Sequence, residues 1–388
     1  MKPANALIAH GGGPTAVINA SLAGLVEECR RQPNVSMLYG AEFGLRGVLE
    51  EKWISLLGRD PELIRSIGES PGSALGSSRL KLEDPDYERV LDVFQRNNIR
   101  CFFYTGGNGS MDTALRLAQC AGASDYELQV IGIPKTIDND LAVTDHTPGY
   151  ASTAHFFAAA ARDVGEDNRS LPSPISVLEV LGRNAGWVAA ATSIARKHED
   201  DAPHLIYFPE RPISLDQMAA DVEQVYRRLG RAVVAVCEGQ LDDTGRTFGA
   251  EVDRPESSVH RLASNLGHTL ARLLSAKLGV RARAEKPGLL GRCCGPFATA
   301  VDRREAFDCG RAAAIAAVEG RTGVMVAIQR DSNDPYRSST FLTALENVAR
   351  LERLLPLEWI APAGNDILPA FTEYAAPLIG GLTGYPRL

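Results

Sequence analysis

The chain has 388 residues, of which 45% are hydrophobic and 23% are charged, so it is long enough for two globular cores rather than one. Its net charge of -7 argues against a nucleic-acid or membrane-surface binder, because such proteins usually carry a basic excess. No apolar stretch approaches the ~18 residues of a membrane-spanning helix, and the N-terminal apolar run is too short for a signal peptide. We therefore expect neither a nucleic acid nor a membrane as a partner.

The seven cysteines are odd in number and scattered, and none has CxxC spacing. This pattern suggests neither a disulfide framework nor a zinc site. A reducing compartment fits best, so the predicted location is the cytoplasm.

The first predicted elements are a strand over Ala6–His10, a glycine-rich turn, and a helix from about Val17 to Arg31. The same order returns later, with a buried strand at Cys101–Tyr104, a second turn, and a helix over Met111–Ala121. A third strand is predicted over Leu128–Ile133. Strands that alternate with helices at this spacing predict a mostly parallel, doubly wound sheet.

A second domain of the same α/β type is predicted after Tyr150. An alanine-rich helix over Ala151–Val164 and a loop over Gly165–Pro174 lead into it. The further predicted elements are strands over Ile175–Val180, Leu205–Phe208 and Ala232–Cys237, and helices from about Ala185 and over Leu215–Leu229.

In the last third of the chain, the boundaries of helices and strands are harder to predict from the sequence. A charged, turn-rich segment, Gly239–Ser257, is expected to lead the chain back towards the first domain. It is followed by a helix over about Ser258–Leu278, a loop over Lys286–Phe297 and a helix near Arg304–Glu319.

Two glycine-rich turns follow strands at the same predicted edge of the first sheet. Gly12 and Gly13 lie in one turn, and Gly106–Ser110 form the other. Glycines let the backbone approach a ligand closely, and the helix after each turn offers unpaired N–H groups to an anion. Either turn alone could be a tight structural turn, but two of them favour a ligand with two phosphate groups. Neither turn completes a Walker A or GxGxxG pattern, which argues against a nicotinamide enzyme.

Lys135–Asp140 combines a lysine, a hydroxyl, an amide and two carboxylates directly after a strand. Alternation would send Thr136, Asp138 and Asp140 to one side of the chain. Such residues can also simply cap a turn. Phosphoryl transfer to a hydroxyl needs a carboxylate for the proton, a cation for the phosphoryl oxygens, and rigid positioning. Because the segment offers all of these residue types, we predict a phosphotransferase site at the carboxyl edge of the sheet.

The order of motifs along most of the chain resembles that of the phosphofructokinase family. These motifs are Gly12-Gly13, Gly76–Arg79, Gly106–Ser110, Pro134–Asp140, Thr144–Gly149, Glu179–Arg183 and Glu238-Gly239. The resemblance implies two doubly wound, Rossmann-like domains with the active site in the cleft between them. It implies a donor-phosphate-binding domain of residues 1–150 with part of 258–320, and a sugar-phosphate-binding domain of 151–257 with part of 321–388.

The resemblance also implies roles for individual residues. Asp138 is similar to the general base that takes the proton of the sugar 1-hydroxyl, and Lys135 and Arg79 are implied to act with it in catalysis. The implied donor-binding residues are Gly12, Gly13, Arg79, Gly107, Asn108, Gly109, Ser110 and Lys135. The implied sugar-phosphate contacts are Thr136, Ile137, Asp138, Asp140, Leu181, Gly182, Arg183, Glu238, Leu289 and Arg292, where Leu289 replaces a histidine that many relatives have.

Three positions bear on the phosphoryl donor and the metal. Lys135 resembles the diphosphate-dependent branch, because ATP-dependent members typically have glycine there. Gly109 leaves ATP open, since diphosphate enzymes commonly carry an aspartate at this position. Asn108 stands where the family usually has a metal-directed aspartate, and we expect it to contact magnesium.

The resemblance implies transfer of a phosphoryl group from diphosphate to the 1-hydroxyl of fructose 6-phosphate, a reversible step of glycolysis and gluconeogenesis. An ATP-dependent 6-phosphofructokinase and a non-catalytic homologue that senses sugar phosphate remain alternatives. Sedoheptulose 7-phosphate remains an alternative acceptor, because it has the same hydroxyl end. The expected assembly is a homo-oligomer, either a dimer or a tetramer.

Overall fold

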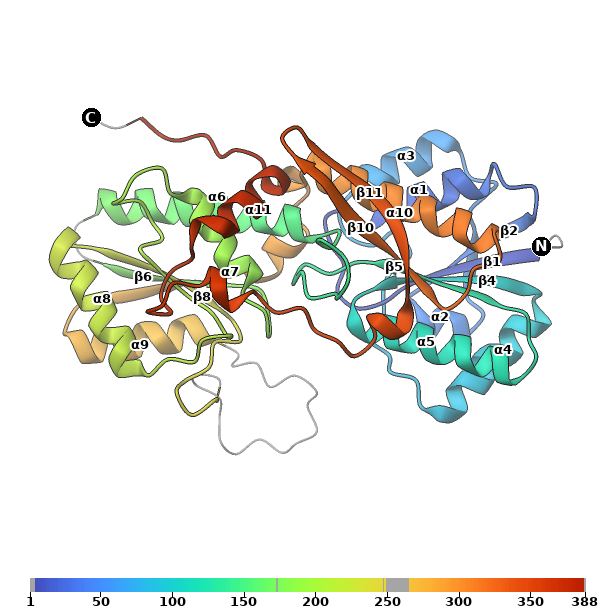
Figure 1. Cartoon of the computed structure of the whole chain (residues 1–388), viewed down its shortest axis with the longest axis horizontal. Coiled ribbons are helices and arrows are strands. Elements are labelled where there is room, and N and C mark those ends of the chain that lie inside the picture. The colour runs from blue at the N-terminus through green and yellow to red at the C-terminus, as the bar shows by residue number, and fades with distance from the viewer. Residues whose placement is uncertain (1–3, 172–173, 247, 249–264, 387–388) are drawn as a thin grey trace. The chain divides into compact units, whose positions relative to one another are not determined.

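The computed structural model describes residues 4–171, 174–246, 248 and 265–386 (Figure 1). The chain forms two compact units: unit 1 comprises Met1–Ser152 and Cys293–Arg353, and unit 2 comprises Thr153–Arg292 and Leu354–Leu388. Each unit contains a mostly parallel sheet and several helices. The predicted α/β class with two doubly wound units is therefore confirmed.

Unit 1 is built on a seven-stranded sheet in the order β11-β10-β5-β4-β1-β2-β3. Strands β10, β5, β4, β1 and β2 run parallel, whereas β11 and β3 are antiparallel edge strands. The strands are β1 (Ala4–His10), β2 (Val35–Ala41), β3 (Trp53–Ser55), β4 (Ile99–Gly106), β5 (Gln129–Pro134), β10 (Val324–Asn333) and β11 (Tyr336–Ala344).

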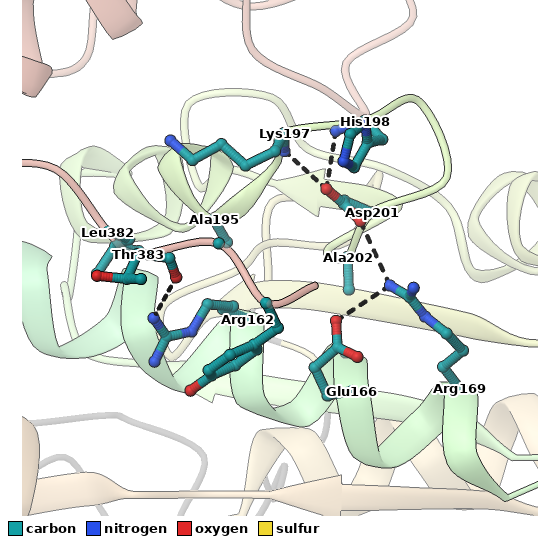
Figure 2. Close-up of a pocket in the computed structure, with 13 residues that line it drawn as sticks. Arg162, Glu166, Arg169, Ala195, Lys197, His198, Asp201, Ala202, Leu382 and Thr383 are labelled. Carbon is teal, nitrogen blue, oxygen red and sulfur yellow. Dashed lines mark hydrogen bonds and ion pairs between the residues drawn. The ribbon is translucent and has the colours of Figure 1, made fainter. Parts of the chain in front are cut away.

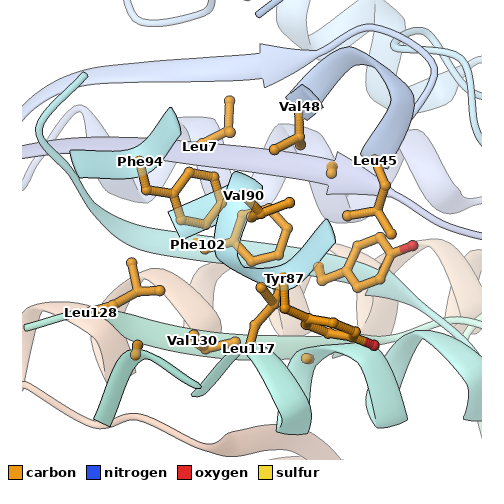
Figure 3. Close-up of a cluster of buried hydrophobic side chains, with 14 of the residues drawn as sticks. Leu7, Leu45, Val48, Tyr87, Val90, Phe94, Phe102, Leu117, Leu128 and Val130 are labelled. Carbon is orange, nitrogen blue, oxygen red and sulfur yellow. The ribbon is translucent and has the colours of Figure 1, made fainter. Parts of the chain in front are cut away.

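Helices cover both faces of the unit 1 sheet. They are α1 (Ile18–Cys29), α2 (Leu45–Leu49), α3 (Pro61–Glu69), α4 (Asp84–Arg96), α5 (Asn108–Ala123) and α10 (Ala300–Val318). Leu7 and Ala9 of β1 belong to the core that includes residues of α2, α4 and α5 (Figure 3), whereas Ala6 and Ile8 belong to the core that includes residues of α1, α3 and α10. Burial on both faces explains why β1 is an apolar run without polar alternation.

Unit 2 contains a four-stranded parallel sheet in the order β7-β8-β6-β9. Its strands are β6 (Ile175–Val180), β7 (Leu205–Tyr207), β8 (Ala232–Cys237) and β9 (Ala282–Glu285). Its helices are α6 (Tyr150–Ser170), which carries the chain out of unit 1, and α7 (Trp187–Ala191), α8 (Leu215–Leu229), α9 (Leu266–Leu278) and α11 (Pro369–Ile379). Helix α8 has the sequence signals of a well-bounded helix, with a Ser214 side-chain cap and a left-handed Gly230 at its end.

Two differences from the sequence predictions concern helix α6 and the point at which the chain returns to unit 1. The helix expected to end at Val164 continues to Ser170, so most of the expected loop over Gly165–Pro174 is helical. The chain returns to unit 1 at Cys293 rather than within Gly239–Ser257, because β9 pairs with β6 in the unit 2 sheet. The first residues of the helix expected from Ser258 lie outside the described residues. None of the described helices combines the length and apolarity needed to cross a bilayer.

Helices α1 and α10 pack at unusually close range through two glycines. A Cβ atom on Gly24 would collide with the carbonyl oxygen of Phe307, and a Cβ atom on Gly310 would collide with that of Ser21. All four residues belong to these two helices. The glycines therefore set the distance between α1, which follows the first glycine-rich turn, and α10.

We predict that Gly24→Ala lowers the free energy of unfolding by roughly 1–3 kcal/mol, because the added methyl group has no space unless the helices separate. Gly122→Ala is a matched control, since Gly122 is an exposed residue of α5 with no atom within 4 Å of an added Cβ. The control should be neutral or stabilising by up to about 1 kcal/mol. Chemical denaturation measures both values, and equal stabilities of the two variants would contradict the prediction.

Candidate active site

The first glycine-rich turn lies at the carboxyl end of β1. The Gly11 amide donates to the Thr105 carbonyl at 2.8 Å, and the Gly12 amide donates to the Ser78 carbonyl at 2.9 Å. Gly12 has a φ of 77°, a conformation that glycine adopts without the steric cost of a side chain. The turn is thus held by the end of β4 on one side and by the segment before Arg79 on the other.

Lys135 is buried against this glycine-rich turn, with 4% of its surface exposed. Its Nζ donates to the Gly11 carbonyl at 2.8 Å and to the Gly13 carbonyl at 2.6 Å. A Cβ atom on Gly12 would lie 3.3 Å from the same Nζ. The structure therefore brings together three of the predicted donor-binding residues, namely Gly12, Gly13 and Lys135, and places a positive charge within the turn.

The second glycine-rich turn leads into α5. Asn108 is the first residue of the helix and Gly107 precedes it in an extended conformation. The first amides of a helix such as α5 lack intrahelical partners and favour an anion. A Cβ atom on Gly109 would meet no atom within 4 Å, so this position is open.

The segment after β5 shows the predicted alternation. Ile137 and Asn139 are buried, whereas Thr136, Asp138 and Asp140 are partly exposed. The Asp138 amide donates to the Thr136 hydroxyl at 3.1 Å, and the buried Asn139 side chain accepts from the amide of Thr147 at 3.0 Å. Burial therefore alternates along the segment as predicted, and the asparagine between the two aspartates anchors the turn.

Asn108 and Asp140 are joined by a hydrogen bond. Asn108 Nδ2 donates to Asp140 Oδ2 at 2.9 Å, so the second turn and the aspartate segment meet here. The Asn108 Oδ1 atom is buried and has no hydrogen-bond partner among the described residues. Burial raises the pKa of Asp140, and the nearby carboxylate of Glu352 adds to this shift. A cation at these oxygens would favour the charged carboxylate.

Arg79 is exposed and forms neither a hydrogen bond nor an ion pair with any described residue. The two residues before it are tied to the first turn, because the Ser77 hydroxyl donates to the Gly12 carbonyl at 2.7 Å and the Ser78 carbonyl accepts from the Gly12 amide. A surface ion pair was the ordinary alternative for this arginine. The described residues form no such pair with Arg79.

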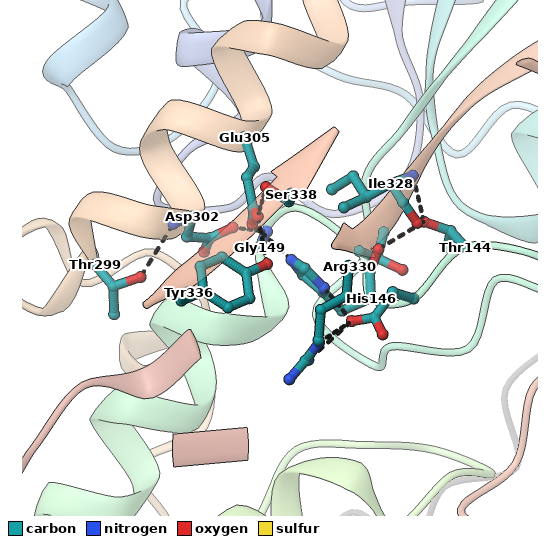
Figure 4. A network of polar contacts seen from close by, with 12 residues as sticks. Thr144, His146, Gly149, Thr299, Asp302, Glu305, Ile328, Arg330, Tyr336 and Ser338 are labelled. Carbon is teal, nitrogen blue, oxygen red and sulfur yellow. Dashed lines mark hydrogen bonds and ion pairs between the residues drawn. The ribbon is translucent and has the colours of Figure 1, made fainter. Parts of the chain in front are cut away.

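His146 lies in a buried polar network that the sequence reasoning did not predict (Figure 4). Its Nε2 contacts Glu305 Oε2 at 2.6 Å and its Nδ1 contacts Asp145 Oδ1 at 2.8 Å. Arg330 of β10 pairs with the same Asp145 oxygen at 2.8 Å. Although burial opposes the charged form, the hydrogen bonds with Asp145 and Glu305 raise the pKa of His146 to about 9. The network ties the loop after the aspartate segment to α10 and β10, and Tyr336 of β11 also donates to Glu305.

In unit 2, predicted sugar-phosphate residues follow two paired strands. Leu181, Gly182 and Arg183 come directly after β6, and Glu238 comes directly after β8. The Glu238 amide donates to the Val180 carbonyl at 3.0 Å. Burial raises the pKa of Glu238, and the positive charge of Arg183 opposes this shift. The structure thus gathers these four predicted residues at the carboxyl edge of the unit 2 sheet.

The remaining predicted residues of unit 2 lie in the short 3-10 helix Gly288–Arg292. Leu289 is largely exposed at 66%, so it is not a core residue. The Arg292 Nε atom is buried and has no hydrogen-bond partner among the described residues. An unpartnered buried guanidinium nitrogen is costly without an acceptor, which is consistent with a site for an anion.

A small cavity of about 40 Å³ in unit 2 contains none of the predicted site residues (Figure 2). Its charged groups are largely paired with one another. Arg169 contacts Glu166 at 3.1 Å and Asp201 at 3.4 Å, while Asp201 also accepts from the amides of Lys197 and His198. These contacts make the cavity a structural feature of the α6 surface.

Residues 5–317 match the family model described as Phosphofructokinase. The chain belongs to the phosphofructokinase family. It is 40% identical to the Rhodospirillum rubrum protein named pyrophosphate–fructose 6-phosphate 1-phosphotransferase, over 96% of this chain and 94% of that protein. A protein of the same name from Halomonas elongata is 36% identical over 98% of this chain and 93% of its own length.

A solved structure shows the same fold. The pyrophosphate-dependent phosphofructokinase from Marinobacter aquaeolei superimposes with a TM-score of 0.88 at 34% sequence identity, and the match covers 100% of this chain and 94% of that chain. The family and the fold that the sequence motifs implied are therefore both confirmed.

Members of the phosphofructokinase family generally use a divalent metal. The described residues contain no cluster of three histidine, cysteine or acidic ligands. Asn108 Oδ1 and Asp140 Oδ1 are buried atoms without a hydrogen-bond partner among the described residues. They suit a hard cation such as Mg²⁺, which usually takes only one or two protein oxygens together with substrate phosphates and water. The residues present therefore fit the metal.

We predict that Asn108→Asp lowers the melting temperature in EDTA and that Mg²⁺ restores it, because the change replaces a hydrogen bond by two like charges that only a cation neutralises. The loss without metal should be roughly 1–3 kcal/mol. Asn365→Asp is a matched control, since Asn365 donates to Asp221 at 2.9 Å and Asp221 also accepts from Tyr207. Equal recovery of both variants in Mg²⁺ would contradict the prediction.

The His146 network predicts a pH-dependent stability. The pKa of His146 is about 9 in the folded chain against an ordinary 6.5, so its contribution is complete below pH 6.5 and is lost as the pH rises through 9. The lost contribution is on the order of 3 kcal/mol. Thermal unfolding between pH 6.5 and 9.5 measures this decline, which His146→Gln should abolish. The exposed His268 is the control, and a His268→Gln variant should keep the full pH dependence.

Proposed function

We propose that this protein transfers a phosphoryl group from diphosphate to the 1-hydroxyl of fructose 6-phosphate, which yields fructose 1,6-bisphosphate and phosphate. The observation that carries this proposal is the position of Lys135, whose ammonium lies within hydrogen-bond distance of two carbonyls of the first glycine-rich turn. A small anionic donor has no adenosine to contribute binding energy, so a fixed positive charge must contribute more. Relatives at 36–40% identity are named for the same reaction.

The donor side of the proposed mechanism uses unit 1. Gly12 allows a close approach of the backbone, and the Gly13 amide and the N-terminus of α5 offer backbone N–H groups to the phosphates. Lys135 and Arg79 supply positive charge. Fixed charges and dipoles of this kind stabilise the charge that develops on the phosphoryl oxygens, and they cost no reorganisation during the reaction. Arg79 suits a small anion because no carboxylate of the described residues pairs with it.

The acceptor side uses Asp138 as the general base. The oxygen of the sugar 1-hydroxyl attacks the terminal phosphorus, the bond from that phosphorus to the bridging oxygen breaks, and phosphate leaves. Asp138 takes the hydroxyl proton, and its partly exposed position on the outward side of the turn leaves it accessible to a substrate. Arg183, Glu238 and Arg292 are the proposed sugar-phosphate contacts, together with Leu181, Gly182 and Leu289.

Mg²⁺ is the proposed metal, with Asn108 and Asp140 as the residues that would hold it. When bound, it neutralises charge on the diphosphate oxygens. Thr136 and Ile137 complete the turn that carries Asp138, and they hold the base in place for proton transfer.

ATP remains the alternative donor because Gly109 is open. An aspartate there would repel an inner phosphate by about 4 kcal/mol at ~4 Å and an effective dielectric of ~20, and glycine imposes no such penalty. A coupled assay that crosses diphosphate and ATP with fructose 6-phosphate and sedoheptulose 7-phosphate tests donor and acceptor together. Turnover with ATP but not with diphosphate would refute the proposed donor, and no turnover with any pair would favour a sugar-phosphate sensor.

We predict that Lys135→Met reduces diphosphate turnover at least about 100-fold, because it removes the charge from the turn and leaves the Gly11 and Gly13 carbonyls without their donor. Lys81→Met is the control, since Lys81 is an exposed lysine close in sequence to Arg79. Steady-state kinetics with each purified variant measure the effect. Diphosphate turnover that survives in Lys135→Met at the level of the control would contradict the prediction.

The proposed protein is a cytoplasmic homo-oligomer, a dimer or tetramer, that acts on small molecules. None of the seven cysteines forms a disulfide, which supports a reducing compartment. The proposed division of labour assigns the donor phosphates to unit 1 and the sugar phosphate to unit 2. Sedimentation of the purified protein tests the assembly.

A further inference from the structure

We propose that His10, acting through Ser73, is a positioning residue that holds the segment Gly76–Arg79 against the first glycine-rich turn and so places Arg79 for the donor phosphates. The inference rests on the proposed function for the role of Arg79. It gives a structural role to His10, which has no other role in the proposed mechanism. His10 is the last residue of β1 and is fully buried.

The hydrogen bonds determine which nitrogen of His10 carries the proton. The Ser73 hydroxyl donates to the Gly76 carbonyl at 2.7 Å, and a hydroxyl has only one proton to donate. His10 Nδ1 lies 2.7 Å from the same hydroxyl oxygen, so Nδ1 must be the donor in that contact. The result is a directional chain from the His10 N–H through the Ser73 O–H to the Gly76 carbonyl.

The tautomer of His10 follows from its contact with Ser73. Its Nε2 atom is buried and has no hydrogen-bond partner among the described residues. Burial, together with the positive charge of Lys135, lowers the pKa of His10 to about 3. The imidazole is therefore neutral at ordinary pH, and Ser73 alone determines its tautomer.

The chain of contacts continues from Gly76 to the donor site. Gly76 has a φ of 70°, which turns the backbone towards Ser77 and Ser78. The Ser77 hydroxyl donates to the Gly12 carbonyl, and the Ser78 carbonyl accepts from the Gly12 amide. Both the amide and the carbonyl of Gly12 are thus hydrogen-bonded to the segment that ends at Arg79.

Arg79 depends on this backbone because its own side chain has no hydrogen-bond or ion-pair partner within the described part of the chain. Nothing in the described chain orients the guanidinium directly, so its position follows from the segment Gly76–Ser78. A loosened turn at Ser73 should therefore weaken the interaction of Arg79 with the donor and leave the sugar-phosphate contacts unaffected.

Ser73→Ala and Ser70→Ala form a matched pair for the test. Both serines lie in the same segment, and each hydroxyl donates to a carbonyl three residues away, Gly76 for Ser73 and Ile67 for Ser70. Each also accepts from a buried side chain, His10 for Ser73 and Asn19 for Ser70. The Ser73 hydroxyl bonds directly to Gly76, whereas Ser70 reaches the segment through Asn19, which also bonds to the Ser70 carbonyl and to the Ala74 amide.

We expect Ser73→Ala to raise the KM for diphosphate up to about tenfold, which is the value of one lost hydrogen bond, with the KM for fructose 6-phosphate changed less than about twofold. Ser70→Ala should leave both unchanged. In an Arg79→Ala background, Ser73→Ala should have no further effect on the donor KM, because its effect passes through Arg79. If Ser73→Ala raised the donor KM by the same factor in the Arg79→Ala background as in the parent protein, the proposal would be overturned. Equal effects of the two serine variants on the donor KM would overturn it too.

His10 variants provide the complementary test. Asparagine can place an amide N–H near the position of Nδ1, so His10→Asn should retain a donor KM closer to the parent value than His10→Leu does. Equal donor KM values for these two folded variants would overturn the proposal.

Hydrogen exchange separates this inference from the proposed function. The amides of Gly76–Leu80 should exchange faster in Ser73→Ala than in the parent protein, whereas Ser70→Ala should not change them. If the parent protein used ATP, the same comparison of donor KM would be made with ATP. If it turned over no donor, the proposed function would fail, and unchanged exchange in Ser73→Ala would separately overturn the positioning role.

Discussion

The donor half of this protein depends on a buried positive charge. Lys135 places its ammonium against the carbonyls of Gly11 and Gly13 and is almost completely removed from water. A buried charge is tolerated only when hydrogen bonds replace its hydration, and two carbonyl dipoles supply them here. The same bonds shape the glycine-rich turn. No side chain can be added at Gly12 without meeting Nζ, so the turn and the lysine constrain each other.

The surrounding polar groups differ in how they compensate charge. His10 is neutral beside Lys135 and contacts a serine hydroxyl rather than a carboxylate. It therefore brings no negative charge to the turn that would neutralise Lys135. His146 instead lies between Asp145 and Glu305, and Arg330 pairs with Asp145. The first arrangement leaves a positive site suited to an anion. The second binds together the loop, helix and strand that support the aspartate segment, as expected for a fully satisfied buried network.

The strands and helices with simple apolar patterns were predictable from the sequence. The predicted boundaries of β6, α8 and β8 agree with the structure, because each has a continuous or periodic apolar run with clear turn residues at its ends. The β10–β11 hairpin was missed. Its outer strand is largely exposed, with residues such as Arg337 and Ser339 that interrupt any apolar run, so its pairing with the sheet has no strong local signal.

The sequence by itself determined the order of the motifs. It also predicted the alternating burial over Thr136–Asp140, although the chain bends there, with a φ of 56° at Asn139, rather than staying extended. Only the tertiary structure decided which groups these residues meet. Lys135 reaches Gly11 because β5, β4 and β1 are neighbours, and His10 meets Ser73 across 63 residues of sequence. Asn108 likewise donates its amide N–H to Asp140, and its Oδ1 meets no partner in the described part of the chain. Strand order and loop closure control such contacts, and no local pattern encodes them.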